Sequence, residues 1–306
     1  MRSSASIQIE AYEAEDFATA IAGLDVEYLR TGGGSEPCRM TVVDQPEAQL
    51  SIGSMGFSAI SRSEVPSEVG VFALITAAPP GGRYCGVDLA AGQLFFYAPG
   101  TSFVGVESAG LEACMLTVPT ASLELAAEGF VDTAMLRSVT ALSPSPEVEQ
   151  LGSLLRSAIK RPTDLPGEHV VEAAAGVLAT DSTPRRSRVG RRLGSHTIVV
   201  RSIEYAERTQ TNQPTVGDLC RASGASASRL RQAFVDVFDL PPTKYFQYRL
   251  LSALRDELAL AGPTTQSVTG ILSSLGVTEF GRISGRYKNA FGELPSATLR
   301  RLPSND

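Results

Sequence analysis

The last third of the chain contains one motif twice, and this repeat constrains the fold more than any other feature. Each copy has apolar or aromatic residues four positions apart and ends at a proline. The two sets are Leu230, Phe234, Phe238 and Pro242, and Ile283, Tyr287, Phe291 and Pro295. Gly224 and Gly276 precede them at positions where an earlier helix can end. Because residues four apart share a helix face, each copy predicts two short helices joined by a tight turn.

The first copy also carries signals for where its helices begin. Thr215 and Ser226 stand directly before helical patterns, where their hydroxyls can cap the first turn. Between the copies, "PPTKYFQYRLLSALRDELALAG" predicts one long helix with Pro242 in its first turn. About 18 helical residues span about 27 Å, against the ~34 Å between successive major grooves on one face of B-DNA. The last third is therefore predicted to be an all-α domain of two helix-turn-helix units joined by a long helix.

The second helix of the first copy has a polar side that suits the reading of bases. Leu230, Phe234 and Val237 share one face of a helical wheel. The opposite face carries small, cationic and amide side chains: Ser228, Arg231, Gln232 and Val235. Arginine can bond guanine at two atoms and glutamine can do the same to adenine, which is how the major groove is read. An ordinary solvated face is the alternative, and the helix-turn-helix context favours base reading.

Charge separates the two parts of a chain whose formal net charge is −6. Residues 1–184 contain 9 Lys and Arg against 23 Asp and Glu, a net charge of −14. Residues 185–306 contain 18 against 10, a net charge of +8. This asymmetry favours a polyanion as the partner of the second part alone. A chance imbalance of solvated surface charges is the alternative.

Residues 38–118 have a pattern that is typical of β-structure. Runs of β-branched and aromatic residues such as "CRMTVVD", "GVFALIT" and "QLFFYAPG" are separated by Gly, Pro, Asp and Ser. This spacing predicts an antiparallel sandwich or barrel. An apolar stripe at helical spacing follows, consisting of Val148, Leu151, Leu155, Ala158 and Ile159. That helix packs either on its own barrel or against a second copy of the chain.

The domain boundary is marked by residues 181–196, which have Pro, Gly and Ser punctuation and five arginines within Arg185–Arg192. This segment predicts an exposed basic linker, which serves either as a plain tether or as an arm that contacts phosphates. We therefore predict a first domain over residues 1–180, the linker over 181–196, and the helical domain over 197–306.

Several classes of protein find no support in the sequence. His169 and His196 both lie outside the β-rich region, and the chain has no phosphate-binding loop, nucleophile elbow or HExxH motif. We therefore expect no catalysis, no bound metal and no other cofactor. The N-terminus lacks the apolar core of a secretory signal, and no apolar run approaches the ~18 residues of a membrane helix. With four cysteines far apart, these features predict a cytoplasmic protein with no membrane association.

Residues 198–301 resemble the DNA-binding domain of the AraC/XylS family of bacterial transcription regulators. The stretches that carry the resemblance are "DLCRASGASASRLRQAFVDVFDLPPTKYFQYRL" and, more specifically, "VTGILSSLGVTEFGRISGRYKNAFGELPSATLRR". Residues 15–118 resemble, more weakly, the cupin-like sensor domain of many members. The resemblance implies a multi-domain α+β protein. Its first domain is a cupin-like β-barrel or jelly roll with flanking helices, and its second is the all-α domain with two helix-turn-helix units.

The resemblance also implies which residues contact double-stranded DNA. The base-reading positions of the first unit are Ala227, Ser228, Arg231 and Gln232, and those of the second are Phe280, Gly281, Ser284 and Gly285. The second set departs from a reading face, because three of its members have almost no side chain. Its cationic neighbours Arg282, Arg286 and Lys288 are predicted to contact phosphates, which position a protein without specifying sequence.

The expected function is that of a sequence-specific transcription regulator, and the resemblance implies an activator of a nearby operon that responds to a small-molecule effector. It also implies a homodimer and contact with RNA polymerase. Repression, and regulation through a partner protein without DNA binding, are the alternatives. Residues that could line an effector pocket are Arg39, Arg83, Tyr84 and Tyr97. Each is alternatively a surface or packing residue, and the first domain alternatively serves for dimerisation alone.

Overall fold

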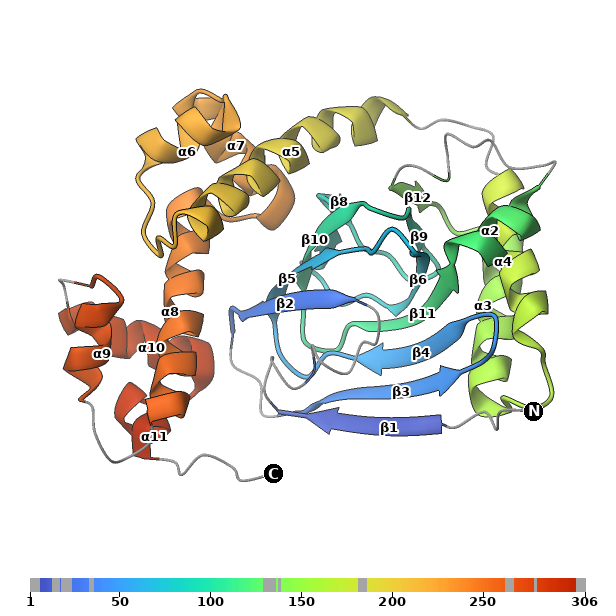
Figure 1. Cartoon of the computed structure of the whole chain (residues 1–306), viewed down its shortest axis with the longest axis horizontal. Coiled ribbons are helices and arrows are strands. Elements are labelled where there is room, and N and C mark those ends of the chain that lie inside the picture. Colours follow the sequence, from blue (N-terminus) through green and yellow to red (C-terminus); the bar gives the residue numbers. More distant parts are fainter. Residues whose placement is uncertain are drawn as a thin grey trace. The chain divides into compact units, whose positions relative to one another are not determined.

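The computed structural model describes residues 6–12, 17, 24–32, 36–128, 136, 139–180, 186–261, 267–277 and 280–300. The chain divides into two compact units, and after the β-rich region the boundary falls between Arg186 and Ser187. Figure 1 shows strands and helices in the described residues up to 180, and helices in the described residues from 186 onward.

The described strands form two sheets. The seven-stranded sheet is antiparallel throughout, in the order β1 (Ser6–Ala11), β3 (Cys38–Asp44), β4 (Gln49–Ser54), β11 (Glu112–Pro119), β6 (Val69–Ala77), β9 (Leu94–Tyr97) and β12 (Thr140–Leu142). The five-stranded sheet has the order β2 (Asp25–Arg30), β5 (Ala59–Glu64), β10 (Ser102–Glu107), β7 (Arg83–Tyr84) and β8 (Val87–Asp88). The prediction of a β domain with flanking helices is confirmed.

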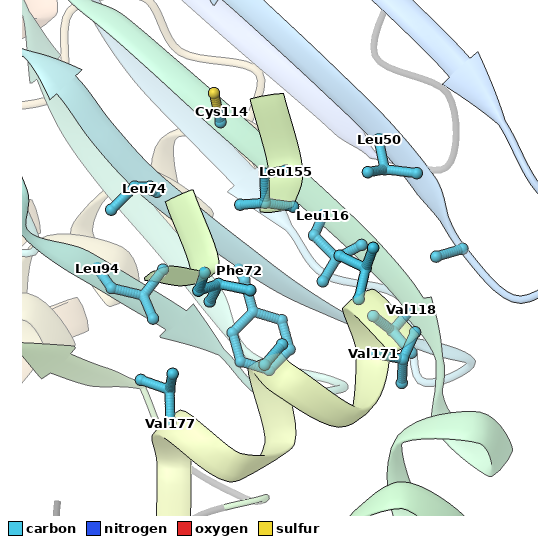
Figure 2. Packing of buried hydrophobic residues seen from close by; sticks show 14 of the residues in the cluster. Leu50, Phe72, Leu74, Leu94, Cys114, Leu116, Val118, Leu155, Val171 and Val177 are labelled. Atoms are coloured by element: carbon cyan, nitrogen blue, oxygen red, sulfur yellow. The ribbon is translucent and has the colours of Figure 1, made fainter. Parts of the chain in front are cut away.

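Three helices cover the seven-stranded sheet: α2 (Thr120–Ala127), α3 (Pro146–Lys160) and α4 (Gly167–Thr180). α3 begins where the Ser145 hydroxyl accepts a hydrogen bond from the Val148 amide, at 3.3 Å, with Pro146 at its first position. Figure 2 shows Leu155 of α3 and Val171 of α4 in one cluster with Leu116 of the sheet. The predicted stripe of α3 belongs to this buried cluster, so the helix packs on its own sheet.

The described residues from 186 onward form helices joined by turns. Its elements are α5 (Arg186–Arg208), α6 (Val216–Ser223), α7 (Ala227–Phe238), α8 (Pro242–Ala261), α9 (Val268–Ser274), the 3-10 turn η3 (Phe280–Arg282), α10 (Ile283–Phe291) and α11 (Pro295–Arg300). The two predicted helix-turn-helix units are therefore α6–α7 and α9–α10, and α8 is the long helix between them. With 20 residues, α8 is about 30 Å long.

One prediction about this unit needs correction. The described part of the predicted linker, residues 186–196, lies in α5 and is helical rather than irregular. Arginine is among the better helix formers, and this preference outweighs the Gly and Ser punctuation on which the prediction rested. The remainder of that linker, residues 181–185, lies outside the described residues.

Both predicted seams form the core of their units. Leu230, Phe234 and Phe238 of α7 are at most 1% exposed, and the Phe234 ring lies 5.6 Å from that of Tyr245 in α8. In the second copy, Ile283 and Tyr287 are buried in one cluster with residues of α8 and α9, including Leu254, Leu258 and Ile271. The second helix of each unit is thus held by one face, which leaves its opposite face for solvent or a partner.

Candidate nucleic-acid interface

In the first helix-turn-helix unit, α6–α7, side-chain caps fix the start of both helices. The Thr215 hydroxyl accepts from the Asp218 amide at 3.1 Å, and the Asp218 carboxylate accepts from the Thr215 amide at 3.1 Å, which is a capping box. The hydrogen bond with the Thr215 side chain holds the pKa of Asp218 below its usual value. Gly224 then turns the chain with φ of 69°, and the Ser226 hydroxyl accepts from the Arg229 amide at 3.3 Å. These contacts define where α7 begins.

The predicted reading residues of α7 share an exposed face. Ala227, Ser228, Arg231 and Gln232 are all exposed, opposite the buried seam. The guanidinium of Arg231 has no hydrogen-bond or ion-pair partner within the described ranges. The amide of Gln232 is held, because its Nε2 donates to Asp236 Oδ1 at 2.7 Å. One candidate reader is therefore unrestrained and the other is oriented by its own helix.

Asp236 is a residue that sequence reasoning missed. Its second oxygen, Oδ2, accepts from the Ser195 hydroxyl of α5 at 2.8 Å and lies 3.7 Å from Arg229 Nη1. The four-residue spacing of Gln232 and Asp236 is the one sequence signal for this arrangement, since such residues are neighbours on a helix surface. The contact with Ser195 spans 41 residues and has no local signal.

The second helix-turn-helix unit, α9–α10, is built differently at the start of α10. The Ser267 hydroxyl caps α9 by accepting from the Gly270 amide at 3.1 Å, and Gly276 turns the chain with φ of 75°. α10 has no side-chain cap, since Arg282 stands at that position and η3 precedes it. A Cβ atom at Gly281 or Gly285 would have no neighbour within 4 Å in the described structure. These glycines therefore serve no packing need there.

Cations, rather than reading side chains, dominate the exposed face of the second unit. Arg282, Arg286 and Lys288 are exposed and have no ion-pair partner in the described part of the chain. Ser284 is half-buried, and the side chain of Phe280 lies outside the described residues although its backbone is in η3. This face can contact phosphates but has little with which to distinguish bases.

The four effector candidates do not form one site. Arg39 of β3 is exposed and lies 3.9 Å from Glu10 and 3.8 Å from Glu36, while Arg83 pairs with Asp88 at 2.6 Å. These two arginines are in different sheets. The two tyrosines do come together: Tyr84 and Tyr97 are buried, with ring centroids 6.5 Å apart, and the Phe103 ring lies 4.6 Å from that of Tyr97.

The aromatic cluster contains a buried acid that the sequence analysis did not single out. Glu107 is 4% exposed, and the Tyr84 hydroxyl donates to its Oε1 at 3.4 Å. Burial raises the pKa of Glu107 to about 7. The buried hydroxyl of Tyr97 has no hydrogen-bond partner among the described residues. A usable signal for Glu107 was its place at the end of a strand, in register with the face of Phe103 and Gly105.

Gly105 is what allows the tyrosine to lie across its strand. It pairs with Tyr84 between β10 and β7, and a Cβ atom at Gly105 would be 2.7 Å from the Tyr84 ring.

No group of three or more His, Cys, Asp or Glu in the described residues is placed to hold a metal ion. In the same residues, no helix combines the length and apolar character needed to cross a membrane.

Comparisons with known proteins bear on the second unit. Residues 219–301 match the family model described as a helix-turn-helix domain. The probable thc operon regulatory protein of Rhodococcus erythropolis is 30% identical over 106 residues, which are 35% of this chain and 32% of that protein. The XylDLEGF operon transcriptional activator of Pseudomonas putida is 29% identical over 101 residues, 33% of this chain and 32% of that protein. This region is an AraC/XylS-type helix-turn-helix domain. The matches span about a third of the length of these curated relatives.

Two solved structures are similar to this chain at low sequence identity. The AraC-like transcriptional activator CuxR is 15% identical, with 81% of this chain and 94% of that chain covered and a TM-score of 0.42. ToxT from Vibrio cholerae O395 is 9% identical, with 90% and 97% covered and a TM-score of 0.30. The assignment of the AraC/XylS-type domain rests on residues 219–301.

Proposed function

We propose that this protein is a sequence-specific DNA-binding transcription regulator that acts in the cytoplasm as an effector-responsive activator of a nearby operon. The observation that carries the proposal is the exposed face of α7. There, Arg231 and Gln232 stand together in the N-terminal half of the second helix of a helix-turn-helix unit, where bases are reached. The operon regulators that match this region support the same function.

The two helix-turn-helix units have different roles on DNA. The guanidinium of Arg231 donates two hydrogen bonds to a guanine, and Gln232 bonds an adenine. In the second unit, Arg282, Arg286 and Lys288 contact phosphates and hold the domain on the duplex. A net charge of +8 over residues 185–306 supports attraction to the polyanion. The net charge of −14 over residues 1–184 repels that part of the chain from DNA.

In this proposal the first unit senses a small molecule and the chain has no catalytic role. The buried Tyr84, Tyr97 and Glu107 are its sensing residues, in place of Arg39 and Arg83, which already have acidic partners. The protein acts as a homodimer that contacts RNA polymerase. The Tyr97 hydroxyl has no partner among the described residues, which supports a ligand role, because a buried polar group without a partner is costly.

The test of DNA reading is a selection from a randomised duplex library by the purified full chain. We expect enrichment of one motif containing guanine and adenine, and affinity that falls steeply as salt rises. The charge-matched control is Arg156→Ala, at an exposed position of α3, which should leave the motif and the affinity unchanged. A chain that binds no DNA at low ionic strength contradicts the proposal and favours regulation through a partner protein.

The test of the sensing site uses the titration of Glu107. Its pKa of about 7 exceeds the usual carboxyl value of 4.5, so the folded state keeps a proton that the unfolded state releases. Stability due to this group is therefore present at low pH and is lost as pH rises through 7. We expect the stability of Glu107→Gln relative to the natural chain to be about 3 kcal/mol more favourable at pH 8 than at pH 4. Thermal unfolding of both chains across pH measures this difference in stability. A difference that does not change with pH contradicts the raised pKa of Glu107.

A further inference from the structure

Asp236 connects three groups on or beside the reading helix. One carboxylate oxygen accepts from Gln232 Nε2 at 2.7 Å, and the other accepts from the Ser195 hydroxyl at 2.8 Å. Arg229 Nη1 lies 3.7 Å from the second oxygen. An aspartate on this face is unexpected, since its charge is repelled by the phosphates that the neighbouring cations attract. The role of Asp236 is therefore expected to come from its hydrogen bonds rather than from its charge.

The position of Asp236 argues against direct base reading by this residue. It is nine residues beyond Ala227, the first residue of α7, and thus about 13 Å further along the helix. The residues that reach base edges are those of the N-terminal half of such a helix. Gln232 lies one turn closer to that end, and its amide is the group that Asp236 contacts.

The hydrogen-bond inventory shows what this contact leaves available. A carboxylate only accepts, so the Gln232 amide must present its nitrogen to Asp236. The amide nitrogen carries two hydrogens, and one is used. Among the described residues, the second N–H and the Gln232 carbonyl oxygen have no partner, and these are the donor and acceptor that adenine N7 and N6 require.

We propose that Asp236 is a specificity-determining positioning residue, which fixes the orientation of the Gln232 amide for adenine without contacting DNA. This inference rests on the proposed function, since it requires α7 to read bases. Ser195 extends the arrangement to α5: its side chain is fully buried, so its hydrogen bond holds the carboxylate in place. The base preference of α7 therefore depends on the seating of α5 against it.

The experiment is a double-mutant cycle read out as base preference. Gln232→Ala, Asp236→Ala and the double variant are compared with the natural chain in competitive binding of a library randomised at every site position. Freeing the Gln232 side chain restores the ordering cost that Asp236 removes, so Asp236→Ala should lower preference at one base pair about three- to tenfold. In the Gln232→Ala background the same change should have no further effect at that base pair.

A conservative variant separates positioning from charge. Asp236→Asn keeps an acceptor for Gln232 and a donor for Ser195, so it should retain the preference that Asp236→Ala loses. Both variants remove a negative charge and should bind all sequences somewhat more tightly. Ser195→Ala keeps the charge but loosens the carboxylate, so it should lower preference at the same base pair by less. If Asp236→Ala does not fold, Ser195→Ala and Asp236→Asn together test the inference.

Each outcome is distinct. Equal loss of preference in both backgrounds overturns the inference, since it means that Asp236 reads a base itself or merely supports the helix. Unchanged preference in Asp236→Ala also overturns it, while a motif that still depends on Gln232 leaves the proposed function standing. A natural chain that selects no sequence refutes the proposed function and this inference together.

Discussion

The two helix-turn-helix units share a scaffold and differ in the face that it presents. In each, a buried seam holds the second helix, and a glycine with positive φ, Gly224 or Gly276, turns the chain before it. α7 presents a guanidinium and an amide to the exterior, whereas η3 and α10 present Gly281 and Gly285 among cations. The comparison teaches that packing fixes where such a helix lies but leaves its exposed chemistry free to vary. One scaffold can therefore carry either a reader or an anchor.

The units also differ in how firmly the second helix begins. The Ser226 hydroxyl caps α7, and Asp236 orients one of its exposed side chains. α10 follows a 3-10 turn and has no side-chain cap at Arg282. Base reading needs side chains held in place, whereas contact with a phosphate tolerates a mobile lysine or arginine. The difference in construction matches the proposed difference in role.

The largest expected effect comes from removing the anchor. Arg282, Arg286 and Lys288 replaced together by alanine should weaken binding to every sequence about a hundredfold at 0.15 M salt. The slope of log affinity against log salt should become shallower by about three units, because three phosphate contacts are lost. Titration of a selected and a scrambled duplex at several salt concentrations measures both. A variant that keeps its affinity for the scrambled duplex would show that the second unit does not anchor.

The next largest effect concerns the reader. Arg231→Ala should cost about 1–3 kcal/mol on the preferred duplex and relax preference at one base pair. Folding should be nearly intact, because the Arg231 side chain is exposed and is not part of the buried seam. Lys288→Ala is the matched variant in the other unit and should weaken all sequences alike. If Lys288→Ala changes base preference and Arg231→Ala does not, reader and anchor are assigned the wrong way round.

Local signals made much of the second unit predictable. Thr215 and Ser226 cap the helices they precede, and Gly224 and Gly276 take the left-handed backbone that their positions implied. Such features depend on residues within one turn of each other, so the sequence contains them. The antiparallel β domain was predictable for the same reason, from short runs and their punctuation.

Contacts between distant residues were not predictable in this way. Ser195 meets Asp236 across 41 residues, and Tyr84 meets Glu107 across 23. Strand alternation indicates which residues share a face but not which face points inward, so Arg83 and Tyr84 looked equally suitable for a pocket. The structure buries Tyr84 and pairs Arg83 with Asp88. The helix over residues 186–196 was not predicted, because the helix propensity of its arginines outweighs the Gly and Ser residues between them.

A smaller effect tests the difference in helix starts. Ser226→Ala removes the hydroxyl that accepts from the Arg229 amide, so it should destabilise α7 by about 1 kcal/mol. Arg282→Ala, at the equivalent position of α10, removes no side-chain cap and should leave the stability of α10 unchanged. Hydrogen exchange of the amides in the first turn of each helix measures this. Equal loss of protection in both variants would mean that the caps do not distinguish the units.

The smallest effect is the sharpest test of the anchor. Gly285 is not among the residues with positive φ, and a Cβ atom there meets nothing within 4 Å, so Gly285→Ala should stabilise α10 by about 0.5–1 kcal/mol. Gly224→Ala is the control, since its φ of 69° should make alanine destabilising there. If α10 reaches DNA only through its cations, Gly285→Ala should leave affinity within about twofold. A tenfold or greater loss for all sequences would instead mean that the α10 backbone itself comes close to the duplex. The glycines would then be part of the interface, and the second unit would be more than an electrostatic anchor.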